Sequence, residues 1–460
     1  MKHSWIVALL LTGCAIGPNY KRPDVPAPPK FRFDQADATT KSLADAKWSE
    51  LFQDPALDRL VNEALTGNFD LNIAAQRVVE ARNFARVQGS FLYPTIGAGA
   101  QFAAARNSEN GSFKLPESQA AASYTQAGFS LSWELDVWGR IRRLNESARA
   151  QYFASEEARR GIVTTLIADV TSTYLSLREL DAELDIAGKT KDIADNGLRL
   201  TTLRHDRGAV TGLDVHQAEQ FLYTATAQIA STERQIAQTE NQLSLLLGRN
   251  PGDIERGKGL EQLAAPAQVP AGLPSALLER RPDIRAAEDT LIAANAQIGV
   301  ARAEYFPQIT LTGFGGFQSR ALTSLFDSGN RQLSILPAAA VPIFNMGRVR
   351  AGVRIAEAQQ REALIGYQKA IQTAFREVSD SLEGYRKTSE QRVQQELLVT
   401  ALRESVRLST LRYRGGLDSF LQVLDAERNL FQGELALAQL RRQELLNVVQ
   451  LYRALGGGWQ

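Results

Sequence analysis

The chain has very little of the material from which metal sites, disulfides and many catalytic centres are built. Its 460 residues include one cysteine and three histidines. A single cysteine excludes an intramolecular disulfide and a thiolate metal cluster. His3 lies near the start of the chain, and His205 and His216 lack second ligands at helical spacing. The sequence therefore predicts no metal site.

An excess of charge of one sign is also missing. The 52 Lys and Arg residues nearly balance the 51 Asp and Glu residues, for a net charge of +1, which gives no electrostatic reason to expect nucleic acid. No nucleophile elbow, phosphate loop or dinucleotide fingerprint is present, which argues against an enzyme and leaves no catalytic residue to name. No run of 18 or more apolar residues occurs, so no transmembrane helix is predicted.

The first residues have the features of a bacterial lipoprotein signal. Lys2 precedes a short apolar run that ends in the sequence LTGC, which resembles a lipobox. In a lipobox the signal peptidase cuts before the cysteine, here Cys14, and the thiol carries a diacylglycerol. We therefore expect a signal peptide over residues 1–13 and a lipidated tether over residues 14–60. Ala15, in place of an Asp, favours delivery to the outer membrane.

The two halves of the sequence repeat one pattern. The pair Gly139-Arg140 recurs as Gly347-Arg348 at an offset of 208 residues (347 − 139), and the segments upstream match at an offset of 213 (307 − 94). A unit of about 210 residues is far longer than a solenoid repeat, so we expect a duplicated domain. The expected divisions are a first repeat over 61–264, a linker over 265–281 and a second repeat over 282–460.

Each half contains two segments with the alternation of a β-strand. From residue 125 to 137 every odd position is apolar or nearly so, and every even position from 126 to 136 is polar or glycine. This period of two gives one apolar face, expected to meet lipid, and one polar face, expected to meet water. About eight strands is the smallest number that closes a filled barrel, so several chains would have to share one barrel. The expected strands are 94–105, 124–137, 307–318 and 331–344.

A very long helix is predicted after each strand pair. Residues 140–206 and 346–414 contain no proline, and a 67-residue helix is on the order of 100 Å long. A tip turn, at 207–213 or 415–420, then leads to a descending helix. Gly208 and Gly416 permit a tight or left-handed backbone in the tip turns. Gly139 and Gly347 mark the turns from strand to helix.

Six motifs carry a resemblance to a known family over essentially the whole chain. They are LTGC, GPNYKRPDVPAP, LLERRPDIRAAEDTLIAANAQIGVARAEYFPQITLT, PIFNMGRVRA, LRYRGGLDSFLQVLDAER and LYRALGGGW. With them the chain resembles the TolC/OprM/NodT outer-membrane factors of Gram-negative tripartite efflux pumps.

The resemblance implies a mainly α protein with a membrane β-barrel. Three chains would form a homotrimer with one twelve-stranded outer-membrane barrel, continued by a long α-helical barrel in the periplasm. The channel would passively conduct drugs or other small molecules and dock with a periplasmic adaptor and an inner-membrane transporter of the RND type. No cofactor is implied besides the covalent lipid on Cys14.

The family's tunnel narrows where the helix tips meet, and the resemblance carries candidate aperture residues onto this chain. Asp418 and Asp425 would form an acidic ring, and Asp214 with Tyr413 would hold neighbouring hairpins shut. Some relatives have Arg in place of Asp418 and Asp in place of Gln422, so the latch differs in detail. The candidates are Asp418, Asp425, Gln422, Asp214, Tyr413 and Arg414.

Other functions stay open at this point. A periplasmic coiled-coil adaptor would also be a lipoprotein with helical hairpins, although it needs no amphipathic strand pairs. Within the channel class, heavy-metal efflux and type I protein secretion are alternatives to the export of small molecules.

Overall fold

The computed structural model describes residues 15–34, 42–106, 108, 121–263, 265–266 and 269–458. Cys14, the expected lipidation site, lies outside the described residues. The chain divides into two compact units, and each draws segments from both halves of the sequence. The first comprises Met1–Asp24, Arg77–Ser155 and Ala286–Tyr367, and the second comprises Val25–Gln76, Glu156–Arg285 and Gln368–Gln460.

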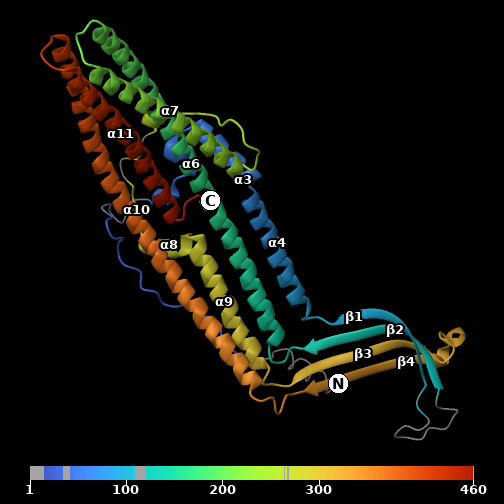
Figure 1. Ribbon diagram of the computed structural model, residues 1–460. Coiled ribbons are helices and arrows are strands. Elements are labelled where there is room, and N and C mark those ends of the chain that lie inside the picture. Colours follow the sequence, from blue (N-terminus) through green and yellow to red (C-terminus); the bar gives the residue numbers. More distant parts are fainter. Residues whose placement is uncertain are drawn as a thin grey trace. The chain divides into compact units, whose positions relative to one another are not determined.

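The first unit contains a four-stranded antiparallel sheet with the strand order β1-β2-β3-β4 (Figure 1). Its strands are β1 (Thr95–Arg106), β2 (Ala121–Leu135), β3 (Gln308–Ser319) and β4 (Arg331–Ala340). The fourth strand was expected to reach residue 344 but ends at Ala340. Pro342 follows, and a proline has no N–H to donate to a strand ladder.

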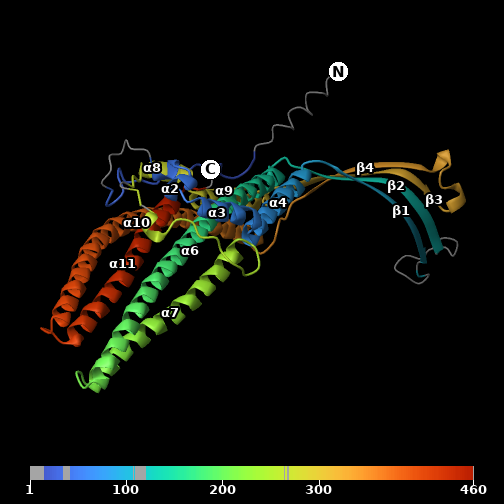
Figure 2. The same ribbon diagram turned by 90° about the horizontal axis from the view of Figure 1, so that it is seen from above.

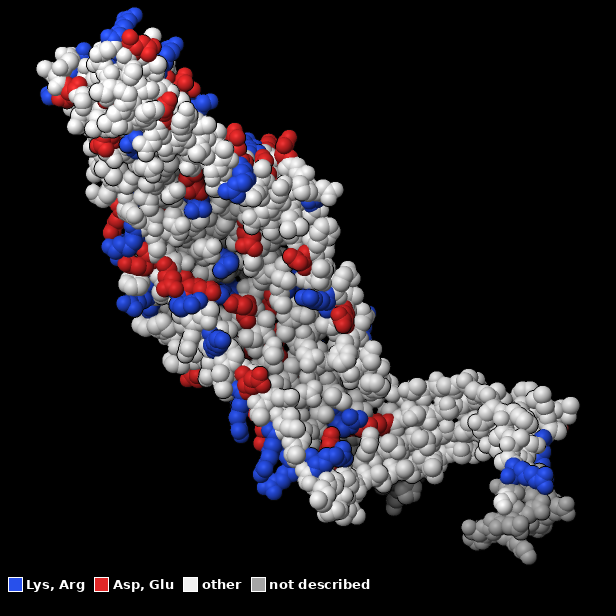
Figure 3. All heavy atoms as spheres, viewed as in Figure 1, with Lys and Arg blue, Asp and Glu red and all other residues white. Residues whose placement is uncertain are grey.

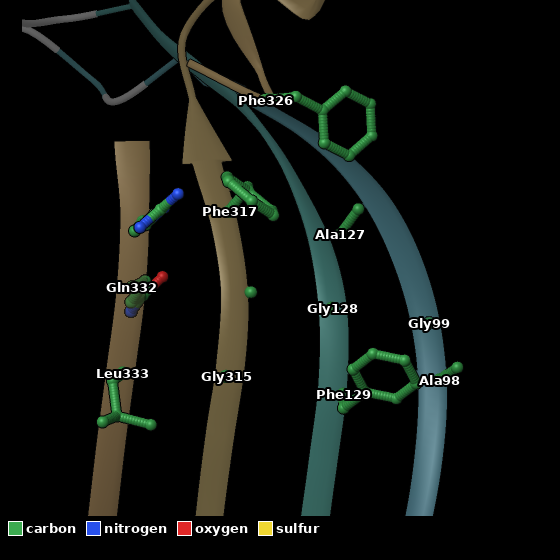
Figure 4. Close-up of a pocket in the computed structure, with 12 residues that line it drawn as sticks. Ala98, Gly99, Ala127, Gly128, Phe129, Gly315, Phe317, Phe326, Gln332 and Leu333 are labelled. Atoms are coloured by element: carbon green, nitrogen blue, oxygen red, sulfur yellow. The ribbon is translucent and has the colours of Figure 1, made fainter. Parts of the chain in front are cut away.

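One face of this sheet is apolar and exposed. Ile96, Phe102 and Phe129 on this face have exposed fractions of 67%, 69% and 64%. Figure 3 shows few charged side chains over the strands on the face in view. The face also holds a hollow of about 830 Å³ beside Phe129 and Leu333, where Gly315 leaves no side chain (Figure 4). The apolar residues at alternate positions of the sequence therefore lie together on one exposed face of the sheet.

The opposite face carries most of the polar side chains of the sheet. Gln101 donates to Gln126 (Nε2 to Oε1, 2.9 Å), which is within 3.4 Å of Gln332. Strand β3 pairs with β2 without a shift in register, so Phe314 lies on this polar face. Its ring covers the facing pair Gly128 and Gly316, since a Cβ at either glycine would lie within 3 Å of the ring. A ring that covers a glycine pair stabilises a strand that lacks side-chain contacts there.

Three helices occur in the same order in each half of the chain, and their lengths match. Helices α4 and α9 have 22 residues each, α6 and α10 have 67, and α7 and α11 have 35. No helix in the described part of the chain combines the length and apolar character needed to cross a membrane. The helices are α2 (Trp48–Phe52), α3 (Pro55–Gly67), α4 (Phe69–Ser90), α6 (Arg140–Asp206), α7 (Gly212–Leu246), α8 (Pro274–Arg280), α9 (Pro282–Ala303), α10 (Arg348–Arg414) and α11 (Phe420–Ala454).

The second long helix begins two residues later than expected. Residue 346 was the expected start, but α10 starts at Arg348. Met346 and Gly347 have φ values of 51° and 81°, which a right-handed helix does not allow. Gly347 corresponds to Gly139, whose φ is also 81°. Both glycines therefore form the turn that precedes a long helix.

The core of the second unit is formed mainly by the long helices. Tyr174, Leu175, Leu243 and Val448 are fully buried. Asp54 is also buried, with 1% of its surface exposed, and caps the first turn of α3 by accepting from the Ala56 amide. A buried carboxylate needs several hydrogen bonds to offset its lost hydration.

Candidate functional site

The two long hairpins, α6–α7 and α10–α11, end within the second unit in turns of the same construction. In both views the hairpins lie side by side (Figures 1 and 2). Gly208 and Gly416 have φ values of 73° and 72°. The residue after each glycine donates its amide to a carbonyl five positions earlier, at 2.8 and 2.9 Å. This is a Schellman motif, which requires the left-handed backbone that glycine adopts without strain.

Asp418 forms an ion pair inside its own turn. It accepts from Arg412 at both oxygens, with Nε to Oδ2 at 2.6 Å and Nη2 to Oδ1 at 3.0 Å. The hydrogen bonds from this guanidinium hold the pKa of Asp418 below its usual range. Asp418 is therefore ionised across the ordinary pH range, and Arg412 offsets its charge.

Asp214 caps the start of α7. It accepts from the Thr211 amide at 2.8 Å and from the Thr211 hydroxyl at 2.7 Å. These two bonds hold the pKa of Asp214 below its usual range. That Asp214 and Tyr413 hold neighbouring hairpins shut stays a prediction.

Tyr413 joins the two hairpins of one chain. Its hydroxyl accepts a hydrogen bond from Arg204 of α6, whose guanidinium carbon lies 4.7 Å from the centre of the Tyr413 ring. The Tyr413 ring lies 5.2 Å from that of Phe420, which packs in a buried cluster with Phe221 of α7. Cation–π and aromatic contacts of this kind stabilise the joint between the hairpins.

The joint was missed in the sequence, although a comparison of the two halves of the chain contains a signal for it. At the offset of 208 residues, Arg204 corresponds to Arg412, but Asp418 corresponds to Val210. Arg204 therefore has no Asp at the corresponding position of its own turn, and it bonds to Tyr413 in the other hairpin. The tips of the two hairpins thus differ in chemistry although their backbones match.

The remaining aperture candidates are exposed near the second tip. Asp425 accepts from Asn429 (Nδ2 to Oδ2, 3.3 Å), and the amide of Gln422 donates to Ser419. Arg414 is the last residue of α10 and is also exposed. Among the described residues, no group of three or more His, Cys, Asp or Glu could hold a metal ion.

A sheet with an exposed apolar face beside long paired helices indicates a protein that meets an apolar environment such as a membrane. The chain belongs to the outer membrane efflux protein family, whose model matches residues 60–249 and 273–457. The assignment made from the six motifs is thereby confirmed, and so is the outer-membrane location. Because this family is one of efflux channels, the interpretation as a periplasmic adaptor is excluded.

Individual relatives match along nearly the whole chain. The solvent efflux pump outer membrane protein SrpC of Pseudomonas putida is 40% identical over 98% of this chain and 97% of its own length. The probable outer membrane lipoprotein SilC of Salmonella typhimurium is 36% identical, with 98% and 97% covered. The open-state structure of the MtrE outer membrane channel of Neisseria gonorrhoeae has a TM-score of 0.88 and 32% identity, with 97% of this chain and 99% of that chain covered.

Proposed function

We propose that three copies of this chain form one channel, with a twelve-stranded barrel in the outer membrane and a helical barrel in the periplasm. Each chain would contribute its four strands and two tandem structural repeats. The channel passively conducts small molecules delivered through a periplasmic adaptor by an inner-membrane transporter of the RND type. Relatives are named as solvent, toluene and antibiotic efflux pump proteins, which supports small organic molecules as the cargo.

The sheet is the observation that carries this proposal. Strands β1 and β4 are its two edges, and each has a neighbour on one side only within the described chain. Unpaired backbone N–H and C=O groups are costly in lipid. Pairing of β1 in one copy with β4 in the next would satisfy both edges and place the exposed apolar face against the membrane. The number of copies rests on the family resemblance.

Purified protein in detergent is expected to have the mass of three chains, because the edges of one sheet need partners from other copies. Reconstituted into planar bilayers, it is expected to give discrete single-channel currents. Light scattering gives the mass, and bilayer recordings give the conductance. A monomer that carries no current would contradict the proposal. Restored solvent tolerance in a strain that lacks the native channel would separate small-molecule export from metal efflux and protein secretion.

We also propose Asp418 as an aperture residue, supported by its place at the hairpin tip. Asp418→Ala is expected to raise single-channel conductance about twofold or more, because the charge and its ion pair with Arg412 are lost from a narrow opening. The Asp418→Glu variant is a matched control that keeps the charge. Because the pKa of Asp418 is lowered, the wild-type conductance should not titrate through this residue between pH 5 and 8. Equal conductance in Asp418→Ala and wild type would remove Asp418 from the aperture.

Cys14 is proposed as the acylated residue of the mature protein, on the evidence of the lipobox. The relative SilC is named as an outer membrane lipoprotein. The mass of the N-terminal peptide would show the acyl chains directly.

A further inference from the structure

Residues 15–22, here called the N-terminal strap, are bonded closely to the first unit. The amide of Ile16 donates to the carbonyl of Trp138 at 3.0 Å. Arg143, near the start of α6, donates to the Ile16 carbonyl at 3.3 Å, the Gly17 carbonyl at 3.4 Å and Asn19 Oδ1 at 2.7 Å. Only 4% of Arg143 is exposed, so these bonds are largely shielded from water. One guanidinium thus holds three points of the strap.

Helix α9 of the same unit holds the strap from another direction. Asn295 donates to the Pro18 carbonyl at 2.9 Å. Glu288 accepts from the Tyr20 hydroxyl at 3.0 Å and pairs with Arg22 at 2.9 Å. The contacts therefore continue along the strap rather than stop at Arg143.

Backbone approaches along the strap are as close as glycine permits. Gly17 has a φ of 106°, and a Cβ at Gly17 would lie 2.5 Å from the Cα of Gly299. A Cβ at Gly139, in the turn between β2 and α6, would lie 2.7 Å from the Cα of Ala15. Such contacts leave no room for a water layer. The strap is therefore packed as part of the fold.

The residues that bind the strap have no chemical equivalents in the other half of the chain. At the offset of 208 residues, Arg143 corresponds to Ala351. At the offset of 213, the strap contacts on α9 correspond to residues of other types on α4. Glu288, Asn295 and Gly299 correspond to Ala75, Arg82 and Arg86. The two halves of the chain therefore have different residues at these strap contacts, and Arg143 is not one of the residues that both halves share.

We propose that Arg143 is a positioning residue that fixes the acylated end of the chain beside the turn between β2 and α6. This inference rests on the proposed lipidation of Cys14. Ala15 is bonded to residue 14, and consecutive Cα atoms are about 3.8 Å apart. The residue acylated in this proposal is therefore one peptide bond from Ala15, which lies against Gly139 in the turn between β2 and α6. When the strap is held, the link between the lipid and that turn is short and ordered, so the effective concentration of the turn at the membrane is high. When the strap is released, the link is longer and flexible, and this effective concentration falls.

Trypsin cleavage after Lys21 reports whether the strap is held. Lys21 is exposed, and the bond after it is cleavable, whereas Arg22 precedes a proline. A protease cleaves a bound segment only while the segment is transiently released, so the cleavage rate follows the population of the released state. Arg143→Gln is expected to raise the rate of this cleavage at least tenfold in purified full-length protein. Glu146→Gln is the matched control, because Glu146 pairs with Arg143 at 2.7 Å within α6 and does not bond to the strap. Equal rates in Arg143→Gln and wild type would overturn the inference.

A double-mutant cycle separates a role through the lipid from a merely structural role. We expect Arg143→Gln to lower the amount of protease-resistant protein in the outer membrane severalfold in the acylated chain. In a Cys14→Ser background it should cause no further loss, since there is no lipid to position. If Arg143→Gln causes equal losses in both backgrounds while the wild-type N-terminal peptide carries the mass of acyl chains, this inference is overturned and the proposed lipidation stands. Absence of the acyl mass overturns the proposed lipidation and this inference with it.

Discussion

Replacement of Gly128 by valine is expected to abolish the folded sheet and to reduce the protein in the outer membrane at least tenfold. A Cβ at Gly128 would lie 2.6 Å from both the Gly315 carbonyl oxygen and the Cα of Gly316, and 2.8 Å from the Phe314 ring. The first two contacts are with backbone, which cannot move aside as a side-chain end can. Strand β2 lies between β1 and β3, so a shift would break the register on both sides. The cost should exceed about 3 kcal/mol.

The matched control for this variant is Gly99→Val in the neighbouring strand. Gly99 pairs directly with Gly128, but a Cβ there would have no neighbour within 4 Å. Valine favours strands, so this variant should assemble at least as well as the wild type. Outer-membrane fractions probed for the protease-resistant form measure both. Wild-type amounts of Gly128→Val would show that β2 and β3 do not approach so closely.

Replacement of Asp54 by alanine is expected to destabilise the second unit by about 3–5 kcal/mol, because several buried donors lose their acceptor together. Besides capping α3, Asp54 accepts from the Tyr174 hydroxyl at 2.9 Å and from the Lys258 amide at 3.1 Å. The Tyr174 hydroxyl in turn accepts from the Gly257 amide at 2.9 Å. One carboxylate therefore connects α3, α6 and the loop after α7.

The thermal midpoint of the purified protein in detergent measures this effect, with an expected decrease of about 10 °C. Asp58→Asn is the control on the same helix. Burial, followed by repulsion from Asp54, raises the pKa of Asp58. Neutralising Asp58 should therefore leave the midpoint unchanged or raise it slightly. A midpoint of Asp54→Ala within a degree or two of wild type would show that the hydrogen bonds of Asp54 do not stabilise this unit.

Local pattern in the sequence predicted the elements of this fold well. The first long helix has the expected bounds, Arg140–Asp206, because a segment without proline continues as a helix until Gly208, whose positive φ ends it. The period of two in residues 125 to 137 predicted β2 and its apolar face, because side chains alternate along any strand, although β2 runs from Ala121 to Leu135 rather than over 124–137. The end of β4 and the start of α10 were placed less accurately, since positive φ values and missing N–H groups at single residues decide such ends.

The partners of individual side chains could not be predicted in this way. Arg204 and Arg412 lie 208 residues apart and match in the alignment of the two halves, yet Arg204 bonds to Tyr413 across the hairpins and Arg412 bonds to Asp418 in its own turn. Phe314 has the aromatic character of a lipid-facing residue, but the unbroken register of β3 places its ring over a glycine pair on the polar face.

By itself the sequence determined the strands with one apolar face, the long helices, the repeated pattern of its two halves and the family. Each of these depends on backbone periodicity or on motifs that lie within one segment. Only the tertiary structure decided that Arg143 holds the N-terminal strap, that Arg204 joins the hairpins and that Gly128 must remain glycine. These roles depend on distances between segments that are far apart in the chain, and such distances are set by packing rather than by local propensity.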